Sequence, residues 1–256
     1  MMNFSFHENI SYPDVANNPE PLNNPNSPTA SEEFHLFAEK LRVPQIEKYI
    51  SRPRLNELLK KSSGQIGATM IIGRAGTGKT TLAMDFAKNY ERVAWYRVEA
   101  TETDWNVFSR YLAESFNEDR LNYKDLPDDV APFIENLFAR LAVFGSREPL
   151  LLVFDDIHYI FDTDWFPEFF NTLLFSHAPN IHLLFLSRCN PTLPLWRLRS
   201  KQVLSVIDEK LLAFNELETE ELFKFNGVST KNALKEQKKL FGRVSKLQDL
   251  IAALKS

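Results

Sequence analysis

The segment Gly73–Thr80 limits what this 256-residue chain can fold into more than any other feature. It reads Gly-Arg-Ala-Gly-Thr-Gly-Lys-Thr and lies between an apolar run, Ala68–Ile72, and a stretch with helical spacing of apolar residues. Gly73, Gly76 and Gly78 allow a tight turn without a Cβ in the way of an anion, and the following helix adds its positive N-terminal end. The order of strand, glycine loop and helix predicts a phosphate-binding loop. The competing interpretation, an accidental glycine turn, does not explain this context.

Each residue of this glycine loop (Gly73–Thr80) has an expected role. We expect the Lys79 ammonium to reach the β- and γ-phosphates of ATP, and the Thr80 hydroxyl to ligate Mg²⁺. Thr81 follows and is placed to bind near the α-phosphate. The remaining nucleotide contacts are expected from Gly73, Arg74, Ala75, Gly76, Thr77 and Gly78. ATP or ADP, together with Mg²⁺, are therefore the expected cofactors.

Two adjacent carboxylates follow the apolar run Leu150–Phe154. Such groups at the end of a buried strand are costly unless they meet a cation. Neighbouring residues of a strand point to opposite faces, so Asp155 and Asp156 are expected to do different work. Asp155 is the candidate for the Mg²⁺ shell, and Asp156 the catalytic group that orients or deprotonates a water molecule. The alternative is that both cap the next helix from a solvated loop.

Arg188 follows another apolar run, Ile181–Leu186, after Ser187. Open parallel sheets bind ligands beyond the carboxyl ends of their strands, so Arg188 is a candidate catalytic residue within reach of a γ-phosphate. A solvated surface arginine is the competing interpretation. His158 fits a helix terminus better than a catalytic role, and Cys189 has no evident partner to activate it.

Apolar runs alternate with helical patterns along most of the chain. This alternation predicts an α/β fold with a doubly wound, mostly parallel five-stranded sheet and a C-terminal helical annex. The expected strands are Ala68–Ile72, Arg92–Val98, Leu150–Phe154, Ile181–Leu186 and Val203–Ile207. The expected helices are Lys79–Tyr90, Asp104–Phe116, Ala131–Phe144 and Phe166–Ser176, and only helical patterns follow from Asn215.

Composition divides the chain into three parts. Asn17–Pro28 is rich in Asn and Pro with little to bury, so residues 1–33 are expected to be a disordered tail. Residues 34–214 are expected to form the sheet domain. Residues 215–256 are expected to form the annex, an incomplete lid over the site.

Charge and cysteine content exclude several classes of protein. A net charge of −4 and a pI near 5.8 argue against a general nucleic-acid binder, and the Lys-rich helix within 231–239 is expected to be a solvated face. We therefore expect no DNA binding by this chain alone. One cysteine favours a reducing compartment, and no charged leader or apolar stretch of about 20 residues is present, so we expect a cytoplasmic protein without membrane contact.

Several segments together resemble the nucleotide-binding domain of the MalT-like, LuxR-type transcriptional regulators, in the STAND class of signalling ATPases. The similar segments are Lys40–Pro44, Ile50–Leu55, the Ala-Gly-Thr-Gly-Lys-Thr-Thr of 75–81, Val93–Tyr96, the Asp-Asp-Ile-His of 155–158, Leu186–Arg188, Pro191, Leu198–Arg199, Phe241–Arg243 and Leu247–Leu254. The chain departs from the family at Thr77, where an aromatic residue is common, and after Gly242, where no proline follows. It also stops at Ser256, before that family's helical-repeat sensor and helix-turn-helix.

This resemblance implies a fold, a site and a function. It implies strand order 5-1-4-3-2, with the strand of Arg188 between the glycine loop and Asp155. It also implies that Arg52 and Pro53 lie over the adenine. ATP binding would favour a self-associating form, or one that binds a protein partner, and slow Mg²⁺-dependent hydrolysis to ADP and phosphate would reset it.

Two other functions fit the same loop. A P-loop kinase or transferase for a small molecule is one, although no arginine-rich lid is evident in the sequence. A scaffold that binds nucleotide without hydrolysing it is the other. A turnover assay with and without acceptor molecules distinguishes the three.

The glycine loop yields the first prediction. Lys79→Ala is expected to abolish most ATP binding, because it removes a charge-assisted phosphate contact worth roughly 1.5–3 kcal/mol. Calorimetric titration measures the loss. Near-parental affinity in the variant would contradict the assignment of the site.

Overall fold

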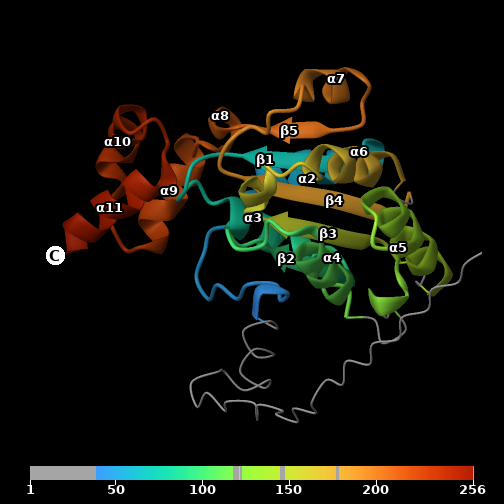
Figure 1. Ribbon diagram of the computed structural model, residues 1–256. Coiled ribbons are helices and arrows are strands. Elements are labelled where there is room, and N and C mark those ends of the chain that lie inside the picture. The colour runs from blue at the N-terminus through green and yellow to red at the C-terminus, as the bar shows by residue number, and fades with distance from the viewer. Residues whose placement is uncertain (1–38, 118–120, 122, 145–147, 177–178, 256) are drawn as a thin grey trace, which may run out of the picture.

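The computed structural model describes residues 39–117, 121, 123–144, 148–176 and 179–255. The disorder expected over residues 1–33 lies outside this part of the chain. Figure 1 shows a sheet between two layers of helices, with further helices beyond the carboxyl ends of the strands.

Five strands form one parallel sheet in the order β2-β3-β4-β1-β5 (Figure 1). They are β1 (Ala68–Ile72), β2 (Arg92–Arg97), β3 (Leu150–Asp155), β4 (Ile181–Ser187) and β5 (Ser205–Ile207). Every residue of β1, β3 and β4 is buried, as expected for apolar runs covered on both faces. The α/β prediction with a five-stranded parallel sheet is confirmed, and the strand order is the one that the family resemblance implied.

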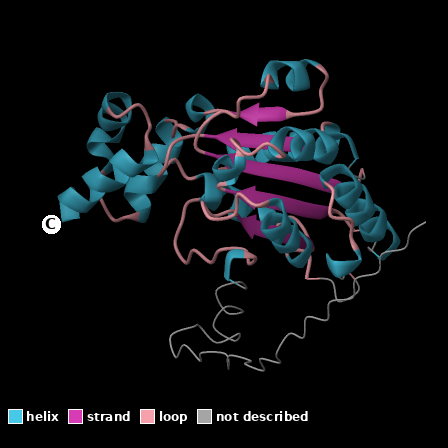
Figure 2. Ribbon diagram, in the orientation of Figure 1, coloured by secondary structure: helices cyan, strands magenta, loops and turns pink. Residues whose placement is uncertain are grey.

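Helices cover both faces of this sheet (Figure 2). They are α2 (Pro53–Gln65), α3 (Lys79–Ala87), α4 (Trp105–Glu114), α5 (Val130–Phe144), α6 (Phe166–Ser176) and the short α7 (Leu195–Ser200). Alternate strand residues such as Tyr96 and Phe154 pack against α4, α5 and α6. Their neighbours Trp95 and Val153 pack against α2 and α3 in a second core. The period-2 alternation of the strands thus divides the apolar residues between two cores.

Some element boundaries differ from those that the sequence predicted. Helix α3 ends at Ala87 rather than Tyr90, because the next N–H groups bond three residues back and tighten the last turn. Strand β5 begins at Ser205 rather than Val203, whose N–H donates to the Leu198 carbonyl instead of entering the sheet. The sequence analysis did not predict α2 or α7. Helix α2 has no side-chain cap and begins with Pro53 in its first turn, where a missing N–H costs nothing.

The annex consists of α9 (Glu216–Phe225), α10 (Ala233–Lys239) and α11 (Val244–Lys255), and the one-turn α8 (Glu209–Leu212) precedes it. Helix α9 starts with a reciprocal capping box between Asn215 and Glu218. Phe214, Leu222, Phe223, Val244, Leu247 and Ile251 form a small core of their own. Division of the chain at residue 214 stays a prediction, although this separate core is consistent with it.

No helix within the described residues combines the length and the apolar character that crossing a membrane requires.

The junction of the annex with the sheet domain yields the second prediction. Gly242 has φ +63°, and a Cβ there would lie 2.3 Å from the Phe214 carbonyl oxygen. Gly242→Ala therefore combines backbone strain with a clash, and we expect a loss of about 2–4 kcal/mol in the free energy of unfolding.

Gly227→Ala is the matched control, because its φ is +68° but a Cβ would meet nothing within 4 Å. It carries only the conformational cost, about 1 kcal/mol. Denaturant titration of both variants measures the difference. Equal losses would show that the contact with Phe214 does not restrain this junction.

Candidate functional site

The parallel register brings three loops to one edge of the sheet. The Gly73 N–H donates to the Ser187 carbonyl at 3.0 Å, so the glycine loop after β1 begins beside the end of β4. Arg188 follows β4 directly. Strand β3, on the other side of β4, ends in Asp155. The residues that the sequence predicted for catalysis therefore meet in space.

The glycine loop folds around the Lys79 ammonium. Gly76 and Gly78 have φ of +74° and +82°, a conformation that a residue with a Cβ adopts only with strain. The buried Lys79 Nζ donates to the carbonyls of Gly73 at 2.7 Å and Arg74 at 3.2 Å. Burial lowers the pKa of Lys79, while the nearby carboxylates work against that shift. The loop thus holds a cation where a phosphate would approach.

Asp155 is the most buried carboxylate of the site, with 3% of its surface exposed. The Thr80 hydroxyl donates to its two carboxylate oxygens at 3.1 and 3.3 Å. Burial, and secondly the charge of Asp156, raises the pKa of Asp155 to about 6. The Lys79 charge opposes this shift without cancelling it. A hydroxyl beside a carboxylate forms a ligand pair suited to Mg²⁺, which completes its shell with phosphate oxygens and water. The residues present fit the expected metal.

Asp156 faces a different partner. The guanidinium of Arg188 donates from Nε to one oxygen and from Nη2 to the other, both at 3.2 Å, and this bond raises the pKa of Arg188. The side chains of Asp155 and Asp156 point to different partners, but strand alternation is not the reason. Asp156 lies beyond the end of β3, and its backbone is left-handed, with φ 57°. His158 Nδ1 lies 3.7 Å from Asp156, and burial lowers the pKa of His158. Arg188 is thus paired with Asp156 at this edge of the sheet, and its predicted contact with a γ-phosphate stays a prediction.

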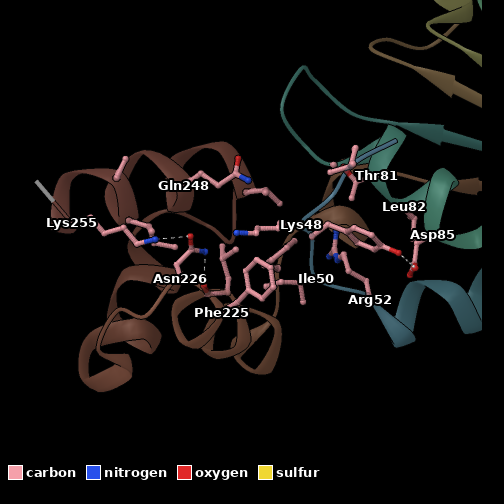
Figure 3. A pocket seen from close by; sticks show the side chains of 18 residues that line it. Lys48, Ile50, Arg52, Thr81, Leu82, Asp85, Phe225, Asn226, Gln248 and Lys255 are labelled. Atoms are coloured by element: carbon pink, nitrogen blue, oxygen red, sulfur yellow. Dashed lines mark hydrogen bonds between the residues drawn. The ribbon is translucent and has the colours of Figure 1, made fainter. Parts of the chain in front are cut away.

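A cavity of about 420 Å³ adjoins the glycine loop at Gly78 and Thr81 (Figure 3). Its walls come from α3, the segment before α2, and the annex, which Figure 3 shows on opposite sides of the space. Apolar side chains such as Ile50, Leu82 and Ile251 line much of it. A cavity of this size and character beside a phosphate loop suits a nucleoside.

Arg52 lies between this cavity and the annex. It is 5% exposed, donates to Glu218 Oε2 from Nη2 at 3.0 Å, and its guanidinium carbon lies 4.3 Å from the centre of the Phe214 ring. Its Nη1 has no hydrogen-bond partner in the part of the chain that the structure describes. Pro53 is exposed, begins α2 and is not among the residues that line the cavity. An adenine contact is therefore geometrically available to Arg52, and that of Pro53 stays a prediction.

Sequence reasoning missed the annex residues that line this cavity and the partner of Arg52. Asn215 and Glu218 have the spacing of a capping box, which signals a helix start but not the long-range ion pair. Burial works to raise the pKa of Glu218, but hydrogen bonds from Arg52 and from the Asn215 backbone outweigh it and lower that pKa. Glu218 therefore remains the charged partner of Arg52.

Comparison with known proteins places this geometry in a family. The model of the AAA ATPase domain family matches residues 52–186, more than half of the chain. The HTH-type transcriptional regulator MalT of Yersinia pestis is 29% identical over 199 residues, 73% of this chain, and that of Yersinia enterocolitica is 28% identical over 200 residues. The chain spans 22% of the length of these curated relatives.

Two solved structures share the fold. A STAND protein with a tetratricopeptide repeat sensor from Pyrococcus horikoshii matches 80% of this chain and 30% of its own, with TM-score 0.54 and 22% identity. A Walker-type ATPase from Pyrococcus abyssi matches 79% of this chain and 67% of its own, with TM-score 0.52 and 13% identity. Both likenesses concern the fold of the sheet and its helices.

Asp155 yields the third prediction. Its folded pKa of about 6 exceeds the unfolded value of 3.8, so the folded state binds this proton more tightly. The destabilisation is absent below pH 3.8 and complete above about pH 6. With chelator present, Asp155→Asn is expected to raise the free energy of unfolding by about 1–3 kcal/mol at pH 8, and by less at pH 5.

Denaturant titration at the two pH values measures this difference, and Asp162→Asn at an acid outside the site serves as the control. The same Asp155→Asn variant is expected to weaken Mg²⁺-dependent ATP binding. If Asp155→Asn is less stable than the parent at pH 8, the buried charge of Asp155 does not destabilise the folded state.

Proposed function

The chain belongs to the AAA ATPase domain family, and on that premise we propose that it is an ATP-controlled switch, the nucleotide-dependent signalling module of a MalT-like transcriptional regulator. In this proposal ATP and Mg²⁺ favour a form that associates with further copies or with a protein partner. Slow hydrolysis to ADP and phosphate returns the chain to its resting form. The likeness to MalT and the glycine loop support this function, and no DNA binding is proposed for this chain alone.

The observation that carries the proposal is the two-pronged bond between Arg188 and Asp156 beside the glycine loop. A terminal phosphate held by Lys79 competes with Asp156 for the same guanidinium, because arginine binds carboxylate and phosphate oxygens in the same geometry. ADP does not present that phosphate. ATP binding therefore exchanges one partner of Arg188 for another, whereas ADP binding leaves the pair intact. Such a contact distinguishes the two nucleotides and can shift a conformational equilibrium.

The same exchange prepares Asp156 for hydrolysis. Once Arg188 turns to the phosphate, the Asp156 carboxylate is free to orient a water molecule and accept its proton. Thr80 and Asp155 would hold Mg²⁺, which neutralises charge on the phosphate oxygens when it is bound. His158 Nδ1 lies 3.7 Å from Asp156, beyond hydrogen-bond distance, so no role in hydrolysis is assigned to it.

In this proposal the position of the annex depends on whether the nucleoside cavity is occupied. Gln248 and Ile251 of α11 and Leu222 of α9 line the cavity proposed for the nucleoside. The Arg52 Nη1 group is available to donate to a ring nitrogen of the base. Occupation of the cavity would therefore fix the annex, acting as the lid, against the sheet domain. A change in that position is the proposed output of the switch.

Arg188 yields the fourth prediction. Arg188→Ala is expected to reduce ATP affinity about 10- to 150-fold more than ADP affinity, since a phosphate contact of roughly 1.5–3 kcal/mol is lost for ATP alone. Paired calorimetric titrations of both nucleotides measure this, and self-association with ATP should fail in the variant. Arg199→Ala, at an exposed arginine of α7, is the matched control. Equal losses for ATP and ADP would remove Arg188 from the switch.

Asp156 yields the fifth prediction. Asp156→Asn is expected to retain ATP binding and to slow hydrolysis by about 10²- to 10⁴-fold, the range typical of losing a general base. Phosphate release under saturating ATP measures the rate, with Lys79→Ala as the non-binding reference. Turnover at the parental rate in Asp156→Asn would show that this carboxylate does not act on water.

A further inference from the structure

A second cavity, of about 770 Å³, adjoins the glycine loop at Arg74 and Thr77, whereas the nucleoside cavity adjoins it at Gly78 and Thr81. The glycine loop, α8 and the turn between α10 and α11 enclose it, and Val244 lines both cavities. Its volume is within the range of small-molecule sites, about 300–1,000 Å³. Arg74 and Thr77 of the glycine loop form part of its wall, but no step of ATP binding or hydrolysis proposed above is assigned to the cavity itself.

Phe241 on its wall combines two unfavourable features. Its backbone has φ +53°, a conformation in which bulky residues are rare and glycine or asparagine is usual. Its ring is 76% exposed, so burial in the protein does not offset that strain. The left-handed turn itself ends α10, because the Gly242 N–H donates to the Gln237 carbonyl and the Phe241 N–H to the Lys238 carbonyl. The exposed ring is the feature of Phe241 that this helix end does not explain.

The charges around this cavity favour an anion. Four of its lining residues are cationic, namely Arg74, Lys210, Lys238 and Arg243, against the single carboxylate of Glu209. Arg74 Nε lies 3.2 Å from both oxygens of Glu209, and Arg243 Nε lies 4.0 Å from one of them. Two guanidinium groups therefore share one carboxylate. A further anion would complete this arrangement, because each guanidinium has donors to spare.

We infer that this cavity binds a small amphipathic anion, with an aromatic or aliphatic body against the exposed Phe241 ring and a phosphate or carboxylate head on Arg243 and Arg74. The ligand would also act on the nucleotide site. Arg74 offers its carbonyl to Lys79, and the Gly242 carbonyl accepts from the Phe214 N–H at 2.8 Å, at the junction of annex and sheet domain. A ligand here touches both the glycine loop and that junction, so its binding and that of nucleotide are coupled reciprocally.

The test uses 1-naphthyl phosphate as a fluorescent probe of the full chain with saturating Mg²⁺ and ADP, so that the nucleoside cavity is filled. We expect about one probe molecule per chain. Neutral 1-naphthol and inorganic phosphate are expected to bind at least tenfold more weakly, since each has only half of the required chemistry. 1-Naphthoate distinguishes a carboxylate head from a phosphate head, and tighter binding of either acid supports the site.

Two variants locate the probe. Phe241→Asn suits the left-handed backbone, so it should keep or raise the melting temperature while weakening probe binding at least tenfold. Arg243→Gln removes one cation and should weaken the charged probes but not 1-naphthol. Leu217→Asn, at a leucine that is 71% exposed on α9 and does not line the cavity, is the matched control and should bind the probe like the parent.

The inference also requires that the probe change the affinity of the parent for ADP, and that this effect vanish in Phe241→Asn. Probe binding of parental strength in both Phe241→Asn and Arg243→Gln would overturn the proposed site. So would strictly competitive displacement of the probe as ADP is raised from zero, with no levelling off once the nucleoside cavity is filled, or a lowered melting temperature of Phe241→Asn with unchanged binding in Arg243→Gln. Lys79→Ala is expected to bind the probe still, so failure of the nucleotide site is distinguishable from failure of this one.

Discussion

The site depends on the parallel register of three strands. Because β4 lies between β1 and β3, the turns that follow these strands open at one edge, and the Gly73–Ser187 hydrogen bond fixes the glycine loop there. Apolar side chains on both faces hold this register, since a slip by one residue would move each of them into the opposite core. The positions of Lys79, Asp155 and Arg188 are thus consequences of core packing that occurs well below the site.

The packing of the two cores also offsets the unfavourable free energy of two features of the site. Asp155 is a buried carboxylate with a hydroxyl but no cation in direct contact, and Asp156 has a left-handed backbone, a cost of about 1–3 kcal/mol. Both are unfavourable for folding. In the proposed function a bound Mg²⁺ would offset the buried charge of Asp155. The two extensive cores that flank the sheet let the fold tolerate them.

The features that could be predicted from the sequence are those that depend on a few neighbouring residues. The glycine loop, the strands and the acids after β3 are each specified by a few consecutive residues, and the structure has them where they were expected. The Arg188–Asp156 bond joins residues 32 apart and the Arg52–Glu218 pair residues 166 apart, and no local pattern states such pairings. Helices α2 and α7 were missed because α2 lacks a side-chain cap and α7 is only 6 residues long with none of them buried. The second cavity depends on packing between segments distant in sequence, so no motif marks it.

Phe214 lies between the nucleoside cavity and the second cavity. Its ring lies against Arg52 at the nucleoside cavity, and its N–H and carbonyl bond to Gly242 and Gln237 beside the second cavity. The annex has its own small core, against which Ile50 of the sheet domain also packs. It joins the sheet domain through Phe214 and through the ion pairs Arg52–Glu218 and Arg243–Glu209. Ion pairs can exchange partners with a ligand or with water at modest cost, whereas a shared core cannot. In the proposed function the annex would shift as a unit about Phe214, and a ligand in either cavity would act on the same pivot.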